Sequence, residues 1–227
     1  MNRSDDRMRI GVIGTGHMGS TLAELWARAE HDLLLGSREP QQARNIVEQI
    51  AARGGPRMRS GSYADAGAHG DVILLATPFF AAAEAVVAAG DLRGKILIDC
   101  TNPIAEGGEM LSVGRTISAA EQIASWAQGA RVVKALNAMG FETLPQPRFG
   151  DQTACTFVCG NDHEARAIVM RLAEDIGLDA IDAGPLTEAR TLEPLALLWI
   201  HLSRRLPQGR GIAFALLRRE MPSGTER

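Results

Sequence analysis

Apolar runs alternate with amphipathic stretches along most of the chain. Residues 9–13 form a short apolar run that stops at a glycine turn, which is typical of a strand buried on both faces. Leu22, Leu25, Trp26 and Ala29 then recur at helical spacing. Because the same alternation continues toward the C-terminal end, the pattern predicts a parallel sheet covered by helices on both faces.

The predicted elements follow each other with no linker-like change of composition and no internal repeat. Strands are predicted at residues 9–13, 32–36, 57–60, 71–76, 95–99, 131–136, 156–159 and 180–183. Helices are predicted from residue 17 onward and at residues 41–53, 81–89, 116–126, 163–176, 188–204 and 212–219. We therefore expect one doubly wound, mainly parallel α/β domain of the Rossmann type, with a short C-terminal helical extension.

The domain boundaries follow from this reading. Residues 1–7 are polar and charged, and we expect them to be flexible. Residues 8–205 are predicted to form a single domain of this Rossmann type with extra strands after residue 150. Residues 206–227 are predicted to form a helical tail.

Ligands of doubly wound sheets bind at the carboxyl ends of the strands, near the point where the strand order reverses. In this chain the loops at those ends begin at Gly14, Gly36, Thr77, Thr101 and Asn137. The sequence therefore predicts that these five loops meet at one edge of the sheet.

The first of these loops has the pattern of a phosphate-binding turn. It contains Gly14, Thr15, Gly16, His17, Met18 and Gly19. The first glycine permits a tight turn, the second lets backbone amides approach a pyrophosphate, and the third lets the helix pack on the strand. An ordinary strand-to-helix turn is the alternative, and the buried strand before it and the amphipathic helix after it favour dinucleotide binding.

The end of the second predicted strand indicates which dinucleotide is bound. NAD-preferring domains usually carry Asp or Glu there, whereas this chain has Gly36, Ser37 and Arg38. A guanidinium can pair bidentately with the 2′-phosphate of NADP, and the serine hydroxyl can donate a further bond. Glu39 lies one residue later and is the alternative ligand for an unphosphorylated ribose. The position of Arg38 favours NADP.

Small polar groups follow three other predicted strands. Thr77 with Pro78, Asn102 and Asn137 can fix the nicotinamide ribose and its carboxamide. An ordinary role as turn or helix-cap residues is an equally good interpretation.

Composition and charge exclude several other classes of function. The chain has 227 residues, enough for one large core or one core with a short appendage, and a net charge of −3 with interspersed signs. That charge pattern does not fit a nucleic-acid-binding surface. The three cysteines are an odd number, which predicts reduced thiols in a cytoplasmic protein, packed in the interior and not bound to metal. The most apolar segment, residues 192–202, is too short to span a membrane.

No side chain stands out as a proton donor, and the catalytic residues stay unassigned. Tyr63 is the only tyrosine and lies early in the chain, while Lys134 lies within a predicted strand, a poor place for a general base. Reduction of a carbonyl usually needs a proton donor. Hydride transfer between two cofactors depends mainly on positioning. The pattern therefore favours a flavin-like acceptor.

With these residues in view, the chain resembles the NADPH-dependent coenzyme F420 reductase family, and it is similar to the oxidoreductase domain of the STEAP metalloreductases. The resemblance spans about residues 8–205. It rests on residues 10–19, 36–38, 133–137, 158–162 and 182–186. The chain departs from the archaeal pattern by a shorter glycine loop and by the sequence Asp-Cys-Thr-Asn-Pro at residues 99–103.

The resemblance implies that Thr15, Ser37 and Arg38 contact NADP. It also implies that coenzyme F420, or FMN or FAD, stacks on the nicotinamide near the loops after Thr77, Asn102 and Asn137, and that the protein is a homodimer. Two alternatives stay open from the residues alone. One is an NADPH-dependent reductase of a small carbonyl or imine, disfavoured because only about 40 residues follow the last motif; the other is a non-catalytic NADPH-binding redox sensor.

Overall fold

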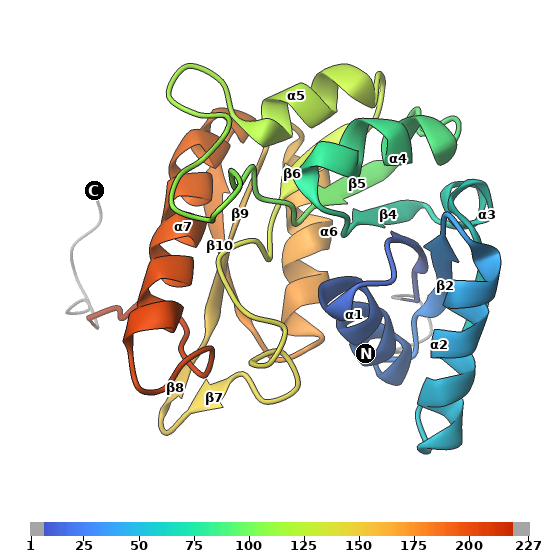
Figure 1. Ribbon diagram of the computed structural model, residues 1–227, viewed down its shortest axis with the longest axis horizontal. Coiled ribbons are helices and arrows are strands. Elements are labelled where there is room, and N and C mark those ends of the chain that lie inside the picture. The colour runs from blue at the N-terminus through green and yellow to red at the C-terminus, as the bar shows by residue number, and fades with distance from the viewer. Residues whose placement is uncertain (1–6, 220–227) are drawn as a thin grey trace, which may run out of the picture.

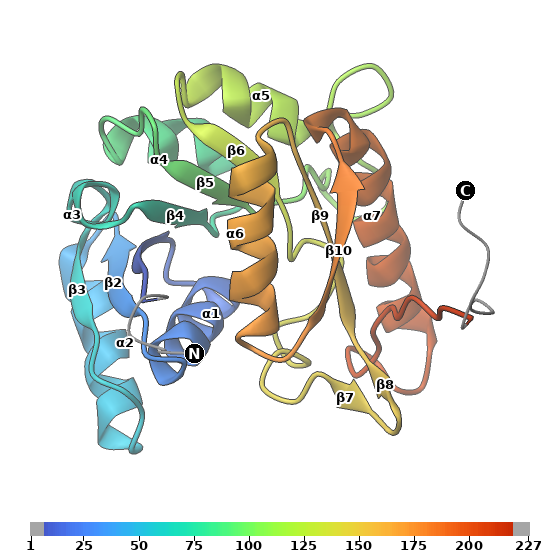
Figure 2. The same cartoon turned by 180° about the vertical axis from the view of Figure 1, so that it is seen from behind.

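The computed structural model describes residues 7–219 (Figure 1). Its central feature is an eight-stranded sheet with helices on both faces. In Figure 1 helix α7 lies in front of one end of this sheet, and in Figure 2, seen from behind, helix α6 covers the same end. The expected flexible N-terminus and the last part of the expected helical tail, residues 1–6 and 220–227, lie outside the described residues.

The elements agree with most of the predicted ranges. The strands are β1 (Arg9–Ile13), β2 (Asp32–Ser37), β3 (Arg59–Ser62), β4 (Val72–Leu75), β5 (Ile96–Asp99), β6 (Arg131–Lys134), β7 (Arg148–Phe149), β8 (Gln152–Thr153), β9 (Cys155–Gly160) and β10 (Asp179–Gly184). The helices are α1 (His17–Arg28), α2 (Pro40–Ala52), α3 (Tyr63–His69), α4 (Ala82–Ala88), α5 (Ala119–Trp126), α6 (His163–Glu174) and α7 (Ala189–Arg205), with short 3-10 turns η2 (Phe79–Ala81) and η3 (Leu186–Glu188).

The strand order is β10-β9-β6-β5-β4-β1-β2-β3. The six strands from β3 to β6 are all parallel, and they have the order that is typical of dinucleotide-binding domains. Strand β9 then pairs antiparallel with β6, and β10 pairs parallel with β9. The two added strands, β9 and β10, therefore run antiparallel to the other six. The prediction of a mainly parallel sheet is confirmed.

Two apolar layers hold the helices on the sheet. One layer joins α1, α2 and α6 to one face through residues such as Ile10, Leu35 and Leu74. The other joins α3, α4, α5 and α7 to the opposite face through residues such as Ile73 and Leu75. Because successive residues of a strand point to opposite faces, an unbroken apolar run such as β4 supplies both layers.

Trp26 fixes the position of α1, the helix that follows the glycine turn. Its side chain is fully buried, and its indole N–H donates to the carbonyl oxygen of Leu172 in α6 at 2.7 Å. The helix that follows the glycine turn is therefore anchored to α6.

The predicted helix at residues 212–219 is wrong. This segment has no regular secondary structure, and it runs alongside the start of β9, where the Cys155 amide donates to the Phe214 carbonyl at 2.8 Å. The Trp199 indole N–H donates to the Ile212 carbonyl at 3.0 Å. The carbonyl groups of Ile212 and Phe214 thus accept hydrogen bonds from Trp199 and Cys155. In a helix they would have accepted from amides of the helix itself. In the expected helical tail, residues 206–210 form a bend and a turn, and residues 211–219 have no regular secondary structure.

Three elements were not predicted. They are α3, capped by Ser62 and Asp65, and the hairpin strands β7 and β8. The reciprocal hydrogen bonds between Ser62 and Asp65 form a capping box, and the spacing Ser-x-x-Asp was visible in the sequence.

A second capping box begins α5 and gives a testable dependence on pH. Glu121 bonds Ser118, and it also accepts two bonds from the Arg190 guanidinium of α7, at 2.6 and 2.8 Å. The hydrogen bonds from Arg190 lower the pKa of Glu121 from 4.5 to about 2. A carboxylate with a lowered pKa stabilises the fold above its unfolded pKa, and this contribution is lost as the pH falls through the folded value.

We therefore expect Glu121→Gln to lower the free energy of unfolding modestly at pH 7. The difference from the wild type should shrink as the pH falls from about 4.5 to about 2, because the wild-type carboxylate is then protonated as well. Urea unfolding of both proteins across this pH range measures the effect. A difference that stays constant with pH would contradict it.

Candidate functional site

The carboxyl ends of five parallel strands meet at one edge, as predicted. Ile13 of β1 lies opposite Gly36 of β2 and Leu75 of β4. Leu75 in turn lies opposite Asp99 of β5, and Asp99 lies opposite Lys134 of β6. The residues proposed for cofactor binding lie at the ends of these strands, in the loops that leave them or in the first turn of α1.

The first and third glycines of the turn are required by close packing. Gly14 has a φ of +117°, and its amide donates to the Gly36 carbonyl at 3.1 Å. A Cβ atom at Gly14 would overlap the carbonyl oxygen of Ala76, and one at Gly19 would overlap the carbonyl oxygen of Gly14. Neither position accepts a side chain without moving backbone.

Gly16 is different, because its surroundings are open. Apart from Gly16 itself and its two chain neighbours, no heavy atom of residues 7–219 lies within 4 Å of the position that a Cβ would occupy there. Gly16 is also the N-cap of α1, and no side chain caps this helix end. The amides of the first turn, which begins with His17 and Met18, therefore lack a side-chain acceptor. An open helix N-terminus of this kind favours an anion.

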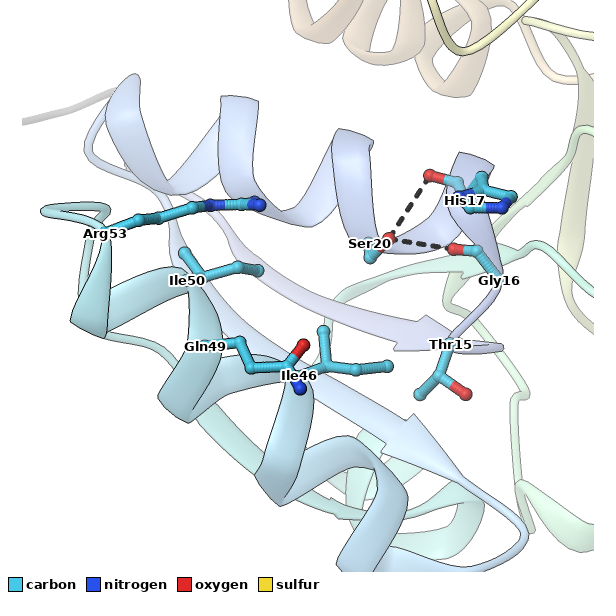
Figure 3. Close-up of a pocket in the computed structure, with 8 residues that line it drawn as sticks. All are labelled: Thr15, Gly16, His17, Ser20, Ile46, Gln49, Ile50 and Arg53. Atoms are coloured by element: carbon cyan, nitrogen blue, oxygen red, sulfur yellow. Dashed lines mark hydrogen bonds between the residues drawn. The ribbon is translucent and has the colours of Figure 1, made fainter.

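A pocket of about 390 Å³ continues from the turn between α1 and α2. Figure 3 shows its lining, which consists of Thr15, Gly16, His17, Ser20, Ile46, Gln49, Ile50 and Arg53. The Ser20 hydroxyl donates to the Gly16 carbonyl at 2.9 Å, and Arg53 pairs with Glu24 across the far end. The glycine turn thus lines one end of the pocket, and Arg53 lines the other.

His17 has a second contact that the sequence did not indicate. Its ring stacks on Phe141 with centroids 4.5 Å apart and an interplanar angle of 12°. Phe141 lies in the loop after β6, and the Arg210 guanidinium lies 5.6 Å from the centre of the same ring. The glycine turn is therefore in contact with the loop after β6 and with the C-terminal segment.

Ser37 and Arg38 occupy the end of β2. The buried Ser37 hydroxyl donates to Gln42 at 3.0 Å and accepts from the Glu39 amide at 3.3 Å, so it shapes the turn into α2. Arg38 is exposed and makes no hydrogen bond or ion pair with another residue of the described range 7–219. Burial raises the pKa of the nearby Tyr63, and the charge of Arg38 partly opposes this rise.

Thr77 and Pro78 follow β4. Pro78 is exposed at the start of η2, whereas the Thr77 hydroxyl is buried without a hydrogen-bond partner among the described residues. Thr101, after β5, has a hydroxyl in the same situation. A buried hydroxyl without a partner costs about 1–3 kcal/mol, so two of them at neighbouring strand ends need an explanation.

Asn102 and Asn137 contact each other. The Asn102 side chain donates to the Asn137 carbonyl at 2.8 Å, and the Asn137 side chain donates to the Asn102 side-chain oxygen at 3.0 Å and to the Leu192 carbonyl at 2.9 Å. The two amides therefore brace the loops after β5 and β6. Leu136, just before Asn137, has a φ of +60°, a left-handed conformation that is rare for such a residue.

Beneath this brace lies a fully buried cluster of charges. The Lys134 ammonium lies 2.8 Å from Asp99 and 3.0 Å from Glu193, and it donates to the Thr101 carbonyl at 2.6 Å. Glu193, in α7, also accepts from the first two amides of α5. Burial lowers the pKa of Lys134, but the two carboxylates outweigh it and raise that pKa above its ordinary value.

The cysteines are buried and free, as predicted. Burial raises the pKa of Cys100 and of Cys159 to about 12. Within residues 7–219, no group of three or more side chains is arranged to hold a metal ion.

Comparison with known proteins identifies the family. The model of the family described as "NADP oxidoreductase coenzyme F420-dependent" matches residues 9–103. The F420-dependent NADP reductase of Methanothermobacter thermautotrophicus is 35% identical over 214 residues, which cover 87% of this chain and 90% of that protein. The chain belongs to the F420-dependent NADP reductase family.

Solved structures and more distant relatives agree with this family. A crystal structure from Arthrobacter sp. FB24, reported as a candidate F420-dependent NADP reductase, superposes with a TM-score of 0.80 at 32% identity and covers 89% of this chain and 96% of that one. The metalloreductase STEAP3 of Rattus norvegicus is 28% identical over 193 residues, covering 84% of this chain but 37% of STEAP3. In the described part of this family member, no helix is long and apolar enough to cross a membrane.

For this member of the F420-dependent NADP reductase family, sequence reasoning missed the charged cluster, the left-handed Leu136 and the stack of Phe141 on His17. The cluster did leave a signal. Its three charged residues all lie in or at the end of apolar segments, where a charge is costly unless it is paired.

Proposed function

We propose that this protein transfers a hydride between NADPH and coenzyme F420. The observation that carries the proposal is the 35% identity to an F420-dependent NADP reductase over nearly the whole of both chains. It is supported by the carboxyl edge of the sheet, where a phosphate-binding turn, an exposed arginine and the strand-end polar groups come together.

The residues at this edge fit NADP. The open position at Gly16 and the uncapped start of α1 suit a pyrophosphate. Arg38, without a partner in the described range, suits a 2′-phosphate, and Ser37 holds the turn that presents it. The unpartnered Thr77 hydroxyl lies at the end of β4, toward the middle of the edge.

The remaining proposed contacts divide by role. Gly14 and Gly19 keep the turn close to β4, while Thr15, His17 and Met18 form the surface of the turn and of the first helical residues. Pro78 forms the exposed border of the edge after β4. We assign Asn102 and Asn137 to the brace that holds the edge together, because most of their donors are already used within the protein.

The chemistry itself belongs to the two cofactors, since a nicotinamide supplies the hydride and a deazaflavin accepts it. The protein's part is to bind the two rings, orient them and exclude water. This division agrees with the absence of an obvious proton donor at the edge in the described residues.

The acceptor is tested by following NADPH oxidation with F420, FMN and FAD offered separately. We expect turnover with F420 to exceed turnover with either flavin. Faster turnover with FMN or FAD would show that the acceptor is a flavin and not the deazaflavin F420. Turnover only with a small carbonyl or imine would contradict the proposal, and tight NADPH binding with no acceptor at all would favour a redox sensor.

We further propose that the protein is a cytoplasmic homodimer. The homodimer is carried over from the family resemblance, and the cytoplasmic location from the three free thiols. The molar mass in solution, measured by light scattering, tests the first of these.

A further inference from the structure

The buried charged cluster of Asp99, Lys134 and Glu193 is a polar feature of the interior that binding of NADP does not explain. All three side chains are at most 1% exposed. With two carboxylates and one ammonium, the cluster carries a formal charge of −1 inside the protein. Such clusters are often no more stabilising than well-packed apolar residues, because desolvation offsets the attraction. Stability alone therefore does not account for it.

The contacts of the cluster lead to the carboxyl edge. Asp99 accepts from the Thr101 amide at 2.8 Å, while Lys134 donates to the Thr101 carbonyl at 2.6 Å. Thr101 is thus held from both sides of its backbone. The next residue, Asn102, forms the brace with Asn137.

The other arm of the cluster belongs to α7. Glu193 bonds the Lys134 ammonium and caps α5, and the preceding residue, Leu192, accepts from Asn137 through its carbonyl. The ends of β5 and β6 are therefore connected to the same turn of α7, once through charges and once through the amide.

Leu136 shows that the loop after β6 is held under strain. Its φ of +60° is unfavourable for a residue with a branched side chain, and its amide donates to the Thr156 hydroxyl of β9 at 2.9 Å. Local strain of this kind persists only when the surroundings over-determine it, and it is often found at functional sites. The backbone conformation of Leu136 determines the position and direction of the next residue, Asn137.

We propose that Asp99, Lys134 and Glu193 are positioning residues that fix the strand ends at Thr101, Asn102 and Asn137, and so place the nicotinamide half of NADPH for transfer. This inference rests on the proposed function, because it assumes that the nicotinamide lies at these strand ends. The adenosine end with its 2′-phosphate, which we place at Arg38, is remote from the cluster along the edge, since β1 and β4 separate β2 from β5.

The test compares two ligands on the purified protein. Adenosine 2′,5′-bisphosphate contains only the adenosine end of NADP, whereas NADP⁺ contains both halves. In Lys134→Met we expect affinity for NADP⁺ to fall at least fivefold, while affinity for adenosine 2′,5′-bisphosphate changes less than twofold. We expect kcat to fall by about 10- to 100-fold, the range for a small misplacement of reacting groups.

Removing Lys134 leaves two buried carboxylates unpaired, which can destabilise the fold. A second variant is therefore needed to separate this effect from positioning. Glu193→Gln keeps the length of the side chain and removes one charge. It should show the same selective loss for NADP⁺, with a several-fold decrease of kcat. Val133→Ala, next to Lys134 in β6 and fully buried, is the control for a destabilised strand. It should leave both affinities and kcat close to those of the wild type in the folded fraction.

The outcomes are distinct. Equal losses for both ligands in Glu193→Gln, or wild-type affinities with wild-type kcat, would overturn the positioning role. If the wild-type protein turned over none of the acceptors, the proposed function would be wrong, but the role of the cluster would not yet be contradicted. The comparison of the two ligands would still decide whether the cluster serves the nicotinamide half.

Discussion

Gly16→Ala is expected to weaken NADPH binding by about 30- to 150-fold while the protein stays folded. The backbone at Gly16 has φ −69° and ψ 176°, an extended conformation that alanine adopts readily, and the space around its Cβ is open. The free energy of unfolding should therefore change only by a helix-cap effect of about 1 kcal/mol or less. The methyl group would occupy space that a pyrophosphate needs to reach the amides of α1.

The expected size follows from those amides. A hydrogen bond to a charged group contributes about 1.5–3 kcal/mol, and a methyl group that keeps the phosphate away weakens more than one such bond. A loss of about 2–3 kcal/mol corresponds to the stated range. Titration of NADPH fluorescence measures the affinity, and circular dichroism on heating measures the stability.

Gly19→Ala is the informative control for this experiment. A Cβ there overlaps the carbonyl oxygen of Gly14, so this variant should lose stability. If Gly16→Ala bound NADPH as tightly as the wild type, the pyrophosphate would not lie on this turn, and the site would have to be sought elsewhere.

Arg38→Ala is expected to weaken NADPH binding by about 1.5–3 kcal/mol, or roughly 10- to 150-fold, and to leave NADH binding nearly unchanged. The guanidinium is exposed and has no hydrogen-bond or ion-pair partner in the described range, so its removal breaks no such bond of the fold. The whole effect should therefore come from the 2′-phosphate, which NADH lacks.

The control for Arg38 is Arg57→Ala. Arg57 is also exposed, but it lies just before β3, at the opposite edge of the sheet. Its removal changes the net charge equally and should affect neither dinucleotide. Dissociation constants for NADPH and NADH at the same ionic strength provide the comparison. Equal losses for both in Arg38→Ala would contradict NADP recognition by this residue.

The glycine turn and the strands were predictable because local sequence determines them. Residues 9–13 and 71–76 are apolar runs that can only be buried, and each ends where a turn residue stops it. Because the two strands are parallel neighbours in the sheet, their carboxyl ends lie side by side. Consequently, the edge could be predicted from the positions of Gly14, Thr77 and Asn137 alone.

The contacts across that edge could not be predicted, because they join distant parts of the chain. Lys134 and Glu193 are 59 positions apart in the sequence, and only the packing of α7 brings them together. Asn102 and Asn137 were interpreted either as ligand contacts or as turn residues, and the hydrogen bonds between the two residues join loops 35 positions apart. The tail at residues 212–219 is amphipathic enough for a helix, but Cys155 and Trp199 take its carbonyls.

The buried cysteines have a consequence for the chemical durability of the protein. With a thiol pKa of about 12, Cys100 and Cys159 carry almost no thiolate at neutral pH, and thiolate is the form that peroxides and alkylating agents attack. Both thiols are therefore poor targets for oxidation and alkylation. Cys155 is also buried, but it lies where residues 212–219 run along the start of β9, and we expect its thiol to become more reactive when that segment detaches.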